Sequence, residues 1–199
     1  MSTQAHATKQ KLILASASPN RLELLKTIDL TPDAVIPADI DETPLKNELP
    51  KDFVLRVARE KAEKIAKTEK NAYIITADTI ACVGRTIIGK AYNEADARKT
   101  LQKLSGRKHR VYSGVCVIAP NGKISNKRIL TYVKFKPLSD SELDIYIASK
   151  QWEGKSGCYG IQSRAGGFVE SINGSFSNVV GLPLVETKNM LIGLGFTRD

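Results

Sequence analysis

Acidic and cationic side chains that suit polyphosphate chemistry are spread through the first half of the chain. Magnesium in proteins is held by one or two carboxylates together with substrate phosphates, and cations offset the charge on the phosphoryl oxygens. If the fold brings these side chains together, they form a site of mixed charge for a metal-bound polyphosphate. The acidic candidates are Asp39, Asp41, Glu42 and Asp78, and the cationic ones are Arg21, Lys61 and Lys90.

Asp78 follows the apolar run Ala72–Ala77, which has the composition of a buried strand. Open α/β sheets bind ligands at the carboxyl ends of their strands, where this carboxylate is expected to lie. Such a carboxylate could hold a metal ion, act as a base or simply form a turn. The residues around Asp78 favour none of these three alternatives.

Arg21 belongs to the segment SASPNR, which follows a second short apolar run, Leu12–Ala15. Ser18 is a good N-cap and Pro19 suits the first helical position, so a strand is predicted to run directly into a helix. The free backbone N–H groups of a helix N-terminus favour an anion. The segment alone is more typical of an ordinary capped helix than of an anion site.

Lys61 and Lys90 are the remaining cationic candidates. Lys61 falls on the apolar stripe of an amphipathic helix that begins at Pro50, so it either snorkels to solvent or turns inward to bind an anion. Lys90 follows Gly89, but this pair is not a P-loop. The required earlier glycine is missing, and Ala91 replaces the Ser or Thr that would hold magnesium.

Nucleophilic catalysis by a serine–histidine or cysteine–histidine pair is not expected. His6 lies near the start of the chain, His109 is placed in a basic loop, and there is no G-x-S-x-G turn. The three cysteines are far apart and form no C-x-x-C pair, which favours buried thiols in a reducing cytoplasm over disulfides or zinc.

The composition is that of a globular protein, and its basic charge fits a polyphosphate substrate, a nucleic acid or a solvated surface. The 199 residues carry a formal charge of +9 and are 42% hydrophobic. No apolar run is long enough to span a membrane, and the basic residues form neither an arginine-rich arm nor an RNA-binding pattern, so a nucleic-acid partner is not favoured.

The elements alternate between strands and helices, which predicts an α/β fold. A hairpin is expected around Asn121-Gly122, so the sheet should be mixed and twisted, with flanking helices. Residues 1–11 are interpreted as a flexible tail, and residues 12–195 as a single domain.

Seven segments, in order, resemble the Maf family of nucleotide pyrophosphatases from Leu12 to Leu194. They are LILASASPNRLELL, DIDETP, LRVAREKA, ADTIACVGRTIIGKA, LSGRKHRVYSGV, GKSGCYGIQ and NGSFSNVVGLPL. The resemblance implies two lobes around a central cleft, as in inosine triphosphate pyrophosphatases, and often a homodimer. It also implies hydrolysis of a nucleoside triphosphate to the monophosphate and pyrophosphate with a divalent metal, Mg²⁺ or Mn²⁺. The segments GCYGIQ and ADT are similar to the branch that acts on dTTP and UTP.

The resemblance also implies roles for particular residues. Asp78 would be the general base, or it would mainly bind metal while Glu42 helps to activate the water. Base choice would involve Thr79 and Gln162, whose amide can donate and accept hydrogen bonds at a pyrimidine edge. The residues implied in substrate and phosphate binding are Ser16, Arg21, Lys61 and Lys90.

Two residues depart from the family pattern. Asn20 stands where the family has an arginine linked to substrate binding, so the change bears on the substrate preference more than on the reaction. Ala91 replaces the usual proline after Lys90, which restores backbone freedom to the loop. Because the family is associated with septum formation, a nucleotide- or nucleic-acid-binding regulator of division with little catalysis is the competing hypothesis. A phosphotransferase would need the phosphate loop that the chain lacks.

Overall fold

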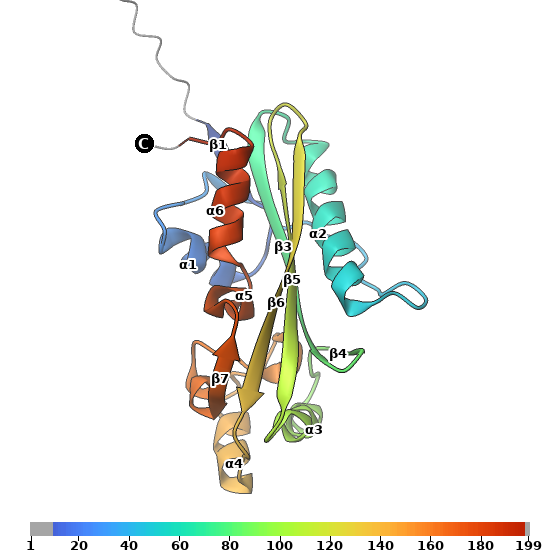
Figure 1. Ribbon diagram of the computed structural model, residues 1–199, viewed down its shortest axis with the longest axis vertical. Helices are drawn as coiled ribbons and strands as arrows, with labels where there is room; N and C mark the ends of the chain where they lie inside the picture. Colours follow the sequence, from blue (N-terminus) through green and yellow to red (C-terminus); the bar gives the residue numbers. More distant parts are fainter. Residues whose placement is uncertain (1–9, 198–199) are drawn as a thin grey trace, which may run out of the picture.

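The structure is a computed structural model that describes residues 10–197. A twisted seven-stranded sheet runs through the molecule, with helices on both faces (Figure 1). The strands are β1 (Lys11–Leu14), β2 (Ala34–Val35), β3 (Ala72–Val83), β4 (Thr86–Ile88), β5 (Lys108–Ile118), β6 (Ile124–Phe135) and β7 (Val169–Asn173). The helices are α1 (Pro19–Lys26), α2 (Pro50–Ala66), α3 (Glu94–Leu104), α4 (Asp140–Ala148), α5 (Phe176–Val180) and α6 (Leu184–Gly193), with short 3-10 turns η1 (Ser156–Cys158) and η2 (Arg164–Phe168).

The sheet is mixed, as the sequence predicts. Its order is β2-β1-β3-β5-β6-β7, with β4 added to β3. Strand β1 is parallel to β2 and β3, whereas β3, β5, β6 and β7 are antiparallel in turn. The predicted hairpin around Asn121-Gly122 is confirmed as the connection between β5 and β6.

Strand β3 changes its neighbour along its length. Its first part pairs with β1 up to Ile75, and its last part pairs with β4 from Ala81. The other edge of β3 pairs with β5 continuously from Ile74 to Cys82. Residues 76–80 therefore have no strand beside them on the β1 and β4 side, which leaves a gap in the sheet.

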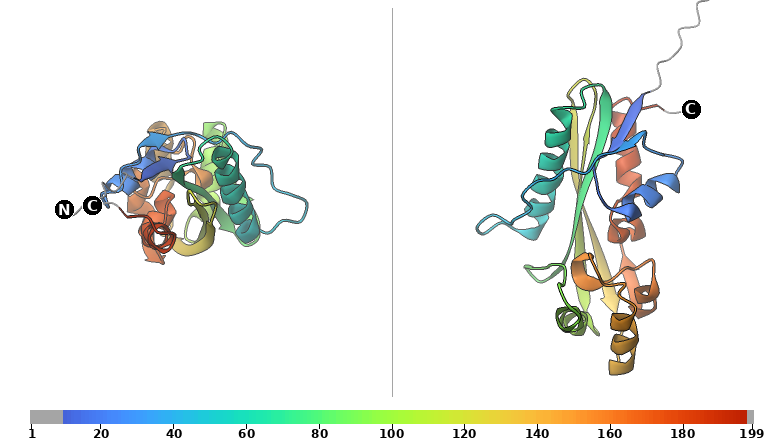
Figure 2. Two further views of the ribbon diagram at one scale, coloured as in Figure 1. Left: turned by 90° about the horizontal axis from the view of Figure 1, so that it is seen from above. Right: turned by 180° about the vertical axis from the view of Figure 1, so that it is seen from behind.

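The helices divide the molecule into two lobes above and below this gap. Helix α2 covers one face of the upper sheet, while α1, α5 and α6 lie on the opposite face (Figures 1 and 2). Helices α3 and α4 lie at the lower end with η1 and η2, around a core that includes Leu101, Phe135 and Phe168. The upper lobe has separate cores on its two faces, one around Leu12 and Met190 and one around Ile13 and Ala62.

Asp78 is not at the end of a strand, which corrects the sequence prediction. Strand β3 continues for five residues beyond it, to Val83, and Asp78 pairs with Gly114 of β5. The β-branched and apolar residues of TIACV support this continuation. Asp78 instead lies at the gap, beyond the last pair between β1 and β3, which is Leu14 with Ile75. The carboxyl end of β1 therefore lies beside Asp78.

The expected start of the domain lies beside the first strand. Strand β1 begins at Lys11, one residue before the expected domain start, and most of the expected tail, residues 1–9, lies outside the described residues. The three cysteines are free and buried, and burial raises the pKa of Cys82 and of Cys116 to about 12, so these two thiols stay protonated. Between residues 10 and 197, no helix combines the length and the apolar character needed to cross a bilayer.

His109 is not in a loop, contrary to the sequence interpretation. It lies in β5, is almost fully buried, and its Nε2 is 2.8 Å from the Tyr159 hydroxyl. The ring packs edge-on against Phe135 and Tyr159, which explains why a histidine beside basic residues is buried. Burial lowers the pKa of His109 from 6.5 to about 4.

This buried histidine predicts a loss of stability in acid. Between pH 6.5 and about 4 the unfolded chain binds a proton at residue 109 that the folded chain does not, so the free energy of unfolding falls as pH falls. At about 1.4 kcal/mol per pKa unit the loss is on the order of 3 kcal/mol. Urea unfolding across this pH range should show a shallower dependence for His109→Gln than for the wild type. Parallel pH profiles of the unfolding free energy for the two proteins would contradict the assignment of this loss of stability to His109.

Candidate functional site

A cleft of about 920 Å³ opens at the gap beside β3. It is lined by β3, the start of α1, the loop before α2, the segment after β4, and the segments around η1 and α5. Two of the acidic candidates, Asp39 and Asp41, do not line this cleft, and Asp41 Oδ1 instead accepts the Thr43 backbone N–H at 2.9 Å. The other residues that the sequence and the resemblance nominate for chemistry all line it. These residues are Ser16, Asn20, Arg21, Glu42, Lys61, Asp78, Thr79, Lys90 and Gln162.

Asp78 faces helix α2 and is paired there with Lys61. The Lys61 Nζ lies 3.0 Å from Asp78 Oδ1 and 2.8 Å from Glu42 Oε1, so one ammonium bridges two carboxylates. Lys61 and Asp78 are only 7% and 6% exposed, whereas the Glu42 side chain is half exposed on its loop. Of the two alternatives for Lys61, the structure shows the inward one.

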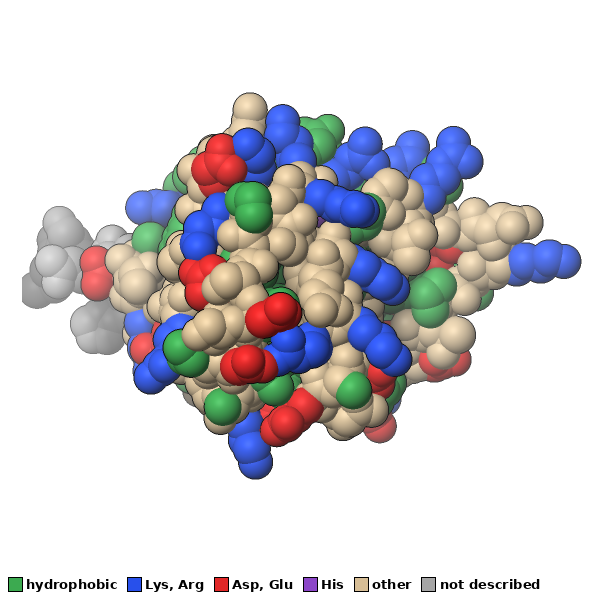
Figure 3. All heavy atoms as spheres, turned by 90° about the horizontal axis from the view of Figure 1, so that it is seen from below, with side chains coloured by type: hydrophobic (Ala, Val, Ile, Leu, Met, Phe, Trp, Pro, Cys, Tyr) green, Lys and Arg blue, Asp and Glu red, His purple; other side chains and the backbone are tan. Residues whose placement is uncertain are grey.

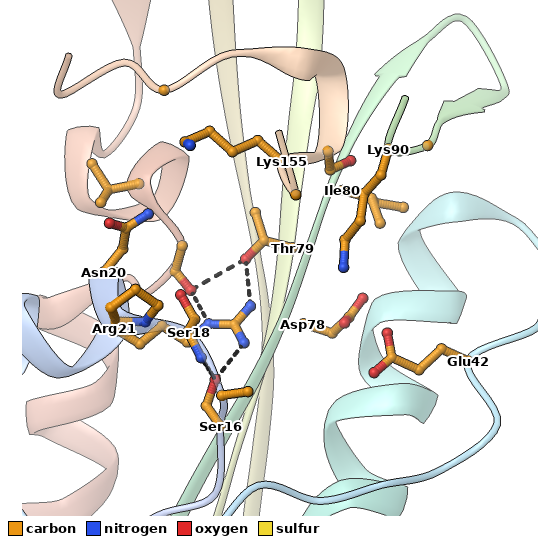
Figure 4. Close-up of a pocket in the computed structure, with 18 of the residues that line it drawn as sticks. Ser16, Ser18, Asn20, Arg21, Glu42, Asp78, Thr79, Ile80, Lys90 and Lys155 are labelled. Carbon is orange, nitrogen blue, oxygen red and sulfur yellow. Dashed lines mark hydrogen bonds between the residues drawn. The ribbon is translucent and has the colours of Figure 1, made fainter. Parts of the chain in front are cut away.

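Thr79 points to the other face of the sheet, because side chains alternate along a strand. Its hydroxyl oxygen lies 2.7 Å from Ser113 Oγ, donates to the Gly181 carbonyl at 3.2 Å, and accepts from Arg21 Nη2 at 3.4 Å. The Thr79 side chain is therefore tied into the wall of the cleft beside Arg21 (Figure 4).

Arg21 is held by three elements at once. Its Nε donates to the Gly181 carbonyl at 2.9 Å, and Nη1 donates to Ser16 Oγ at 2.9 Å, in addition to the Thr79 contact. A guanidinium has five N–H donors, so at least two remain for a ligand. Burial lowers the pKa of Arg21 and the nearby Asp78 and Glu42 raise it, but an arginine stays charged in either case.

The start of α1 also faces the cleft. Ser18 occupies the N-cap position and Pro19 the first turn, as predicted, but the Ser18 side chain caps no backbone N–H. The Ser18 backbone N–H instead donates to Ser16 Oγ at 3.2 Å. The Ser18 hydroxyl and the first turn of α1 are thus directed at the same space as Arg21 (Figure 4).

Lys90 is exposed on the opposite wall, and its ammonium points toward Asp78 and Glu42 (Figure 4). Asn20 and Gln162 also line the cleft, and Asn20 lies away from the two carboxylates (Figure 4). The three cations nominated from the sequence therefore reach the space around Asp78 from α1, α2 and the segment after β4.

Two residues of the cleft were not singled out from the sequence. Lys155 extends across the cleft on the side of Asn20 (Figure 4), and its Nζ lies 3.4 Å from the Glu153 carbonyl oxygen. Tyr92, just beyond Lys90, lines the cleft although it is 94% exposed. Lys155 lies in GKSGCYGIQ, one of the segments that carry the resemblance, and this could have nominated it for the cleft. No sequence feature nominates Tyr92.

The donor set suits a magnesium or manganese ion bound with a substrate. Glu42 and Asp78 converge on the Lys61 ammonium, which shows that the pair attracts positive charge at this point. Residues 10–197 contain no group of three or more His, Cys, Asp or Glu side chains that could hold a metal alone. Magnesium needs only one or two carboxylates when substrate phosphates complete its shell, so these residues fit.

The fold and the cleft define a class of protein. It is a two-lobed, mixed α/β protein whose cleft holds the cations Arg21, Lys61, Lys90 and Lys155 around two converging carboxylates. Such a site is equipped for a polyanion and its counter-ion.

Comparison with known proteins gives the family. The profile of the Maf-like protein family matches residues 11–194, and this chain belongs to that family. It is 52% identical over 185 residues to a dTTP/UTP pyrophosphatase of Caulobacter vibrioides, covering 93% of this chain and 96% of that protein. A dTTP/UTP pyrophosphatase of Agrobacterium fabrum is 51% identical over 195 residues, covering 95% and 94% of the two chains.

Solved structures show only a distant likeness. The Ham1 protein of Staphylococcus aureus has a TM-score of 0.44 and 18% identity, covering 63% of this chain and 72% of that one. A dITP/XTP pyrophosphatase of Mycobacterium abscessus has a TM-score of 0.40 and 15% identity, with 63% and 73% covered.

Proposed function

We propose that this protein is a nucleoside triphosphate pyrophosphatase that hydrolyses dTTP or UTP to the monophosphate and pyrophosphate. The observation that carries the proposal is the convergence of Asp78, Glu42 and four cations on one cleft. Relatives that share half of their residues with this chain over nearly its full length bear the name dTTP/UTP pyrophosphatase. No observation on the described residues favours the competing hypothesis of a regulator with little catalysis.

In this proposal Asp78 is the general base. A base needs a fixed position within hydrogen-bond reach of the attacking water, and Asp78 is held by strand β3 and by Lys61. Glu42 lies on a loop and is half exposed, which suits a metal ligand better than a base. Asp78 takes the proton as the water oxygen bonds to phosphorus, and the electron pair of the broken anhydride bond leaves with pyrophosphate.

The phosphates are assigned to the cationic walls. Arg21 and the first turn of α1 offer N–H donors from one side, Ser16 lies beside them, and Lys90 faces them from the other side. Lys61 keeps Asp78 and Glu42 together. Glu42 and Asp78 would hold Mg²⁺ or Mn²⁺, which when bound neutralises charge on the phosphate oxygens.

Base choice is assigned to Asn20 and Gln162, which both line the cleft. Both side chains carry an amide that can donate and accept hydrogen bonds at a pyrimidine edge. Thr79 is engaged with Ser113, Gly181 and Arg21, so its proposed part in base choice acts through the placement of Arg21. Lys155 supplies positive charge on the side where Asn20 stands in place of an arginine.

The remaining parts of the proposal concern context. Residues 12–195 are taken as one domain because the cleft is lined by segments from Ala15 to Gly181. The three free, buried thiols support a cytoplasmic location. On the lower face of the molecule, Lys and Arg side chains are most numerous along one side, and Asp and Glu side chains lie mainly on the other half of that face (Figure 3). A nucleic-acid partner is not part of the proposal. The homodimer and the link to septum formation stay predictions.

The experiment that tests the function is a pyrophosphate-release screen. The purified protein is incubated with each natural ribonucleoside and deoxyribonucleoside triphosphate, with Mg²⁺ or Mn²⁺ and with chelator. We expect release from dTTP and UTP that requires the metal. A protein that releases pyrophosphate from none of these triphosphates would refute the proposal.

Lys90→Gln should lower kcat/KM for the preferred triphosphate by about a hundredfold. The ammonium of Lys90 faces the carboxylates in a space shared with the phosphates, and its loss removes about 3 kcal/mol of charge stabilisation. Steady-state kinetics measures the effect. Arg85→Gln is the matched control, because Arg85 is exposed in the turn between β3 and β4 and does not line the cleft. Equal kinetics in the two variants would remove Lys90 from the site.

A further inference from the structure

One wall of the cleft is an extended loop, residues 37–49, that contains no helix or strand. Pro37, Ala38, Glu42 and Pro44 of this loop line the cleft. Beyond them the loop projects away from the sheet beside the start of α2 (Figures 1 and 2). The first part of the loop is anchored, because Ala38 and Ile40 pack against buried cores and Lys64 Nζ donates to the Asp39 carbonyl. The position of Glu42 also depends on what holds the part of the loop that follows it.

Arg56 of α2 holds the part of the loop that follows Glu42. Its Nε and Nη2 lie 2.7 Å and 2.8 Å from the two carboxylate oxygens of Glu48, which is a bidentate pair. Nη2 also donates to the Thr43 carbonyl at 3.1 Å, and Nη1 lies 3.0 Å from Glu60 Oε2. One guanidinium thus binds the loop at residue 43, next to Glu42, and at residue 48.

The loop is organised around the same ion pair. Glu48 Oε2 accepts the Leu45 backbone N–H at 3.0 Å, so the carboxylate that binds Arg56 also closes the tip of the loop. The Arg56 and Glu48 side chains are only 20% and 8% exposed. An ion pair with this geometry and burial is stronger than the exposed pairs of a protein surface.

Helix α2 and loop 37–49 also meet at the carboxylates of the cleft, through Lys61 and Glu42. Arg56 and Lys61 lie on the same helix. The loop that Arg56 holds contains Glu42, whose Oε1 lies 2.8 Å from Lys61 Nζ. Moving the loop would therefore separate Glu42 from Lys61 and Asp78 without disturbing strand β3.

We propose that Arg56 is a positioning residue that, through Glu48 and the Thr43 carbonyl, holds loop 37–49 so that Glu42 completes the metal-binding side of the cleft. The role of Glu42 as a metal ligand rests on the proposed function. The restraint of the loop by Arg56 is independent of the proposed function. Lysine cannot replace Arg56 because an ammonium lacks the planar fork that binds two carboxylate oxygens and a carbonyl together.

The test compares Arg56→Lys and Glu48→Gln with a control on the same helix. Arg59→Lys changes an exposed arginine whose Nε pairs with Glu63 at 2.7 Å, with side chains 57% and 44% exposed. The first readout is the rate of tryptic cleavage after Lys46, which lies in the loop. The second is Mn²⁺ binding, measured by calorimetry in the presence of a non-hydrolysable α,β-imido analogue of dUTP.

We expect Arg56→Lys and Glu48→Gln each to accelerate cleavage after Lys46 and to weaken Mn²⁺ binding, both by about tenfold, while Arg59→Lys matches the wild type. Tenfold corresponds to about 1.4 kcal/mol, in the range of one charged hydrogen bond. The double variant should add little to either single variant, since both break the same pair. Cleavage and Mn²⁺ binding equal to the control in both variants would overturn the inference. If the wild type hydrolyses no triphosphate, the proposed function fails, and the cleavage rates still decide whether Arg56 restrains the loop.

Discussion

Asp78→Asn should lower kcat for triphosphate hydrolysis by about a thousandfold while the protein stays folded. General-base catalysis contributes roughly a hundred- to ten-thousandfold, and an amide cannot accept the proton of the attacking water. The substitution keeps the shape of the side chain. It also leaves an oxygen that can accept the hydrogen bond from Lys61 Nζ, which is 3.0 Å from Asp78 Oδ1 in the wild type. Single-turnover kinetics measures the loss, and the melting temperature and circular dichroism verify the fold.

Glu42→Gln is the informative comparison for this prediction. If Asp78 is the base, the Glu42 variant needs more metal but recovers turnover at high metal concentration. If Glu42→Gln abolishes turnover at every metal concentration and Asp78→Asn retains it, water activation belongs to Glu42. Unchanged turnover in Asp78→Asn would remove that residue from the mechanism.

Gly114→Ala should destabilise the protein by about 3 kcal/mol or more and remove its activity. A Cβ atom at residue 114 would lie 2.0 Å from the carbonyl oxygen of Val54, so α2 would have to move off the sheet. Gly114 pairs with Asp78 across β3 and β5, and α2 carries Lys61, so this close approach lets Lys61 reach Asp78. Urea unfolding and kinetics together measure the two effects.

Gly167→Ala is the matched control for Gly114→Ala. A Cβ atom at residue 167 would meet no atom within 4 Å, and the residue does not line the cleft. Its stability and activity should stay close to those of the wild type. A Gly114 variant as stable as the Gly167 variant would show that the tight contact between α2 and β5 is not needed.

The cleft is the part of the molecule that the sequence predicts best. Lys61 stands on an apolar helical stripe, where a cation is unusual, and the structure gives it two carboxylate partners. Arg21 lies at a strand-to-helix turn, and the first turn of α1 does face the cleft. Helical spacing and helix N-terminal chemistry are local properties of the chain, so they nominate these positions. The direction of Lys61 and the use of the α1 start depend on tertiary contacts, and the sequence left both open.

Asp78 shows where local reasoning is misleading. A carboxylate after an apolar run looks like the end of a strand, because an unpaired charge is costly inside a sheet. The strand continues because Lys61, 17 residues earlier, supplies the missing charge at 3.0 Å. The gap beside residues 76–80 depends on where β1 stops and β4 starts, and no pattern within β3 specifies it.

The contacts of His109 with Tyr159 and of Arg56 with Glu48 are not indicated by the sequence either. A histidine between two basic residues looks exposed, but Tyr159, fifty residues later in the chain, provides its buried partner. Arg56 looks like one charge among several on α2, and its bidentate bond depends on the path of loop 37–49. In both cases the partner is determined by tertiary structure, which charge and hydropathy patterns do not encode.

Identification of the products of UTP hydrolysis by ³¹P nuclear magnetic resonance is the most direct test of the central claim. The claim is that a triphosphate held between Arg21 and Lys90, with Asp78 at the reacting bond, is split into a monophosphate and pyrophosphate. The account predicts UMP and pyrophosphate in equal amounts from the wild-type protein with Mg²⁺ or Mn²⁺, and neither from Asp78→Asn. Formation of UDP and orthophosphate, or the same products from Asp78→Asn at the wild-type rate, would contradict it.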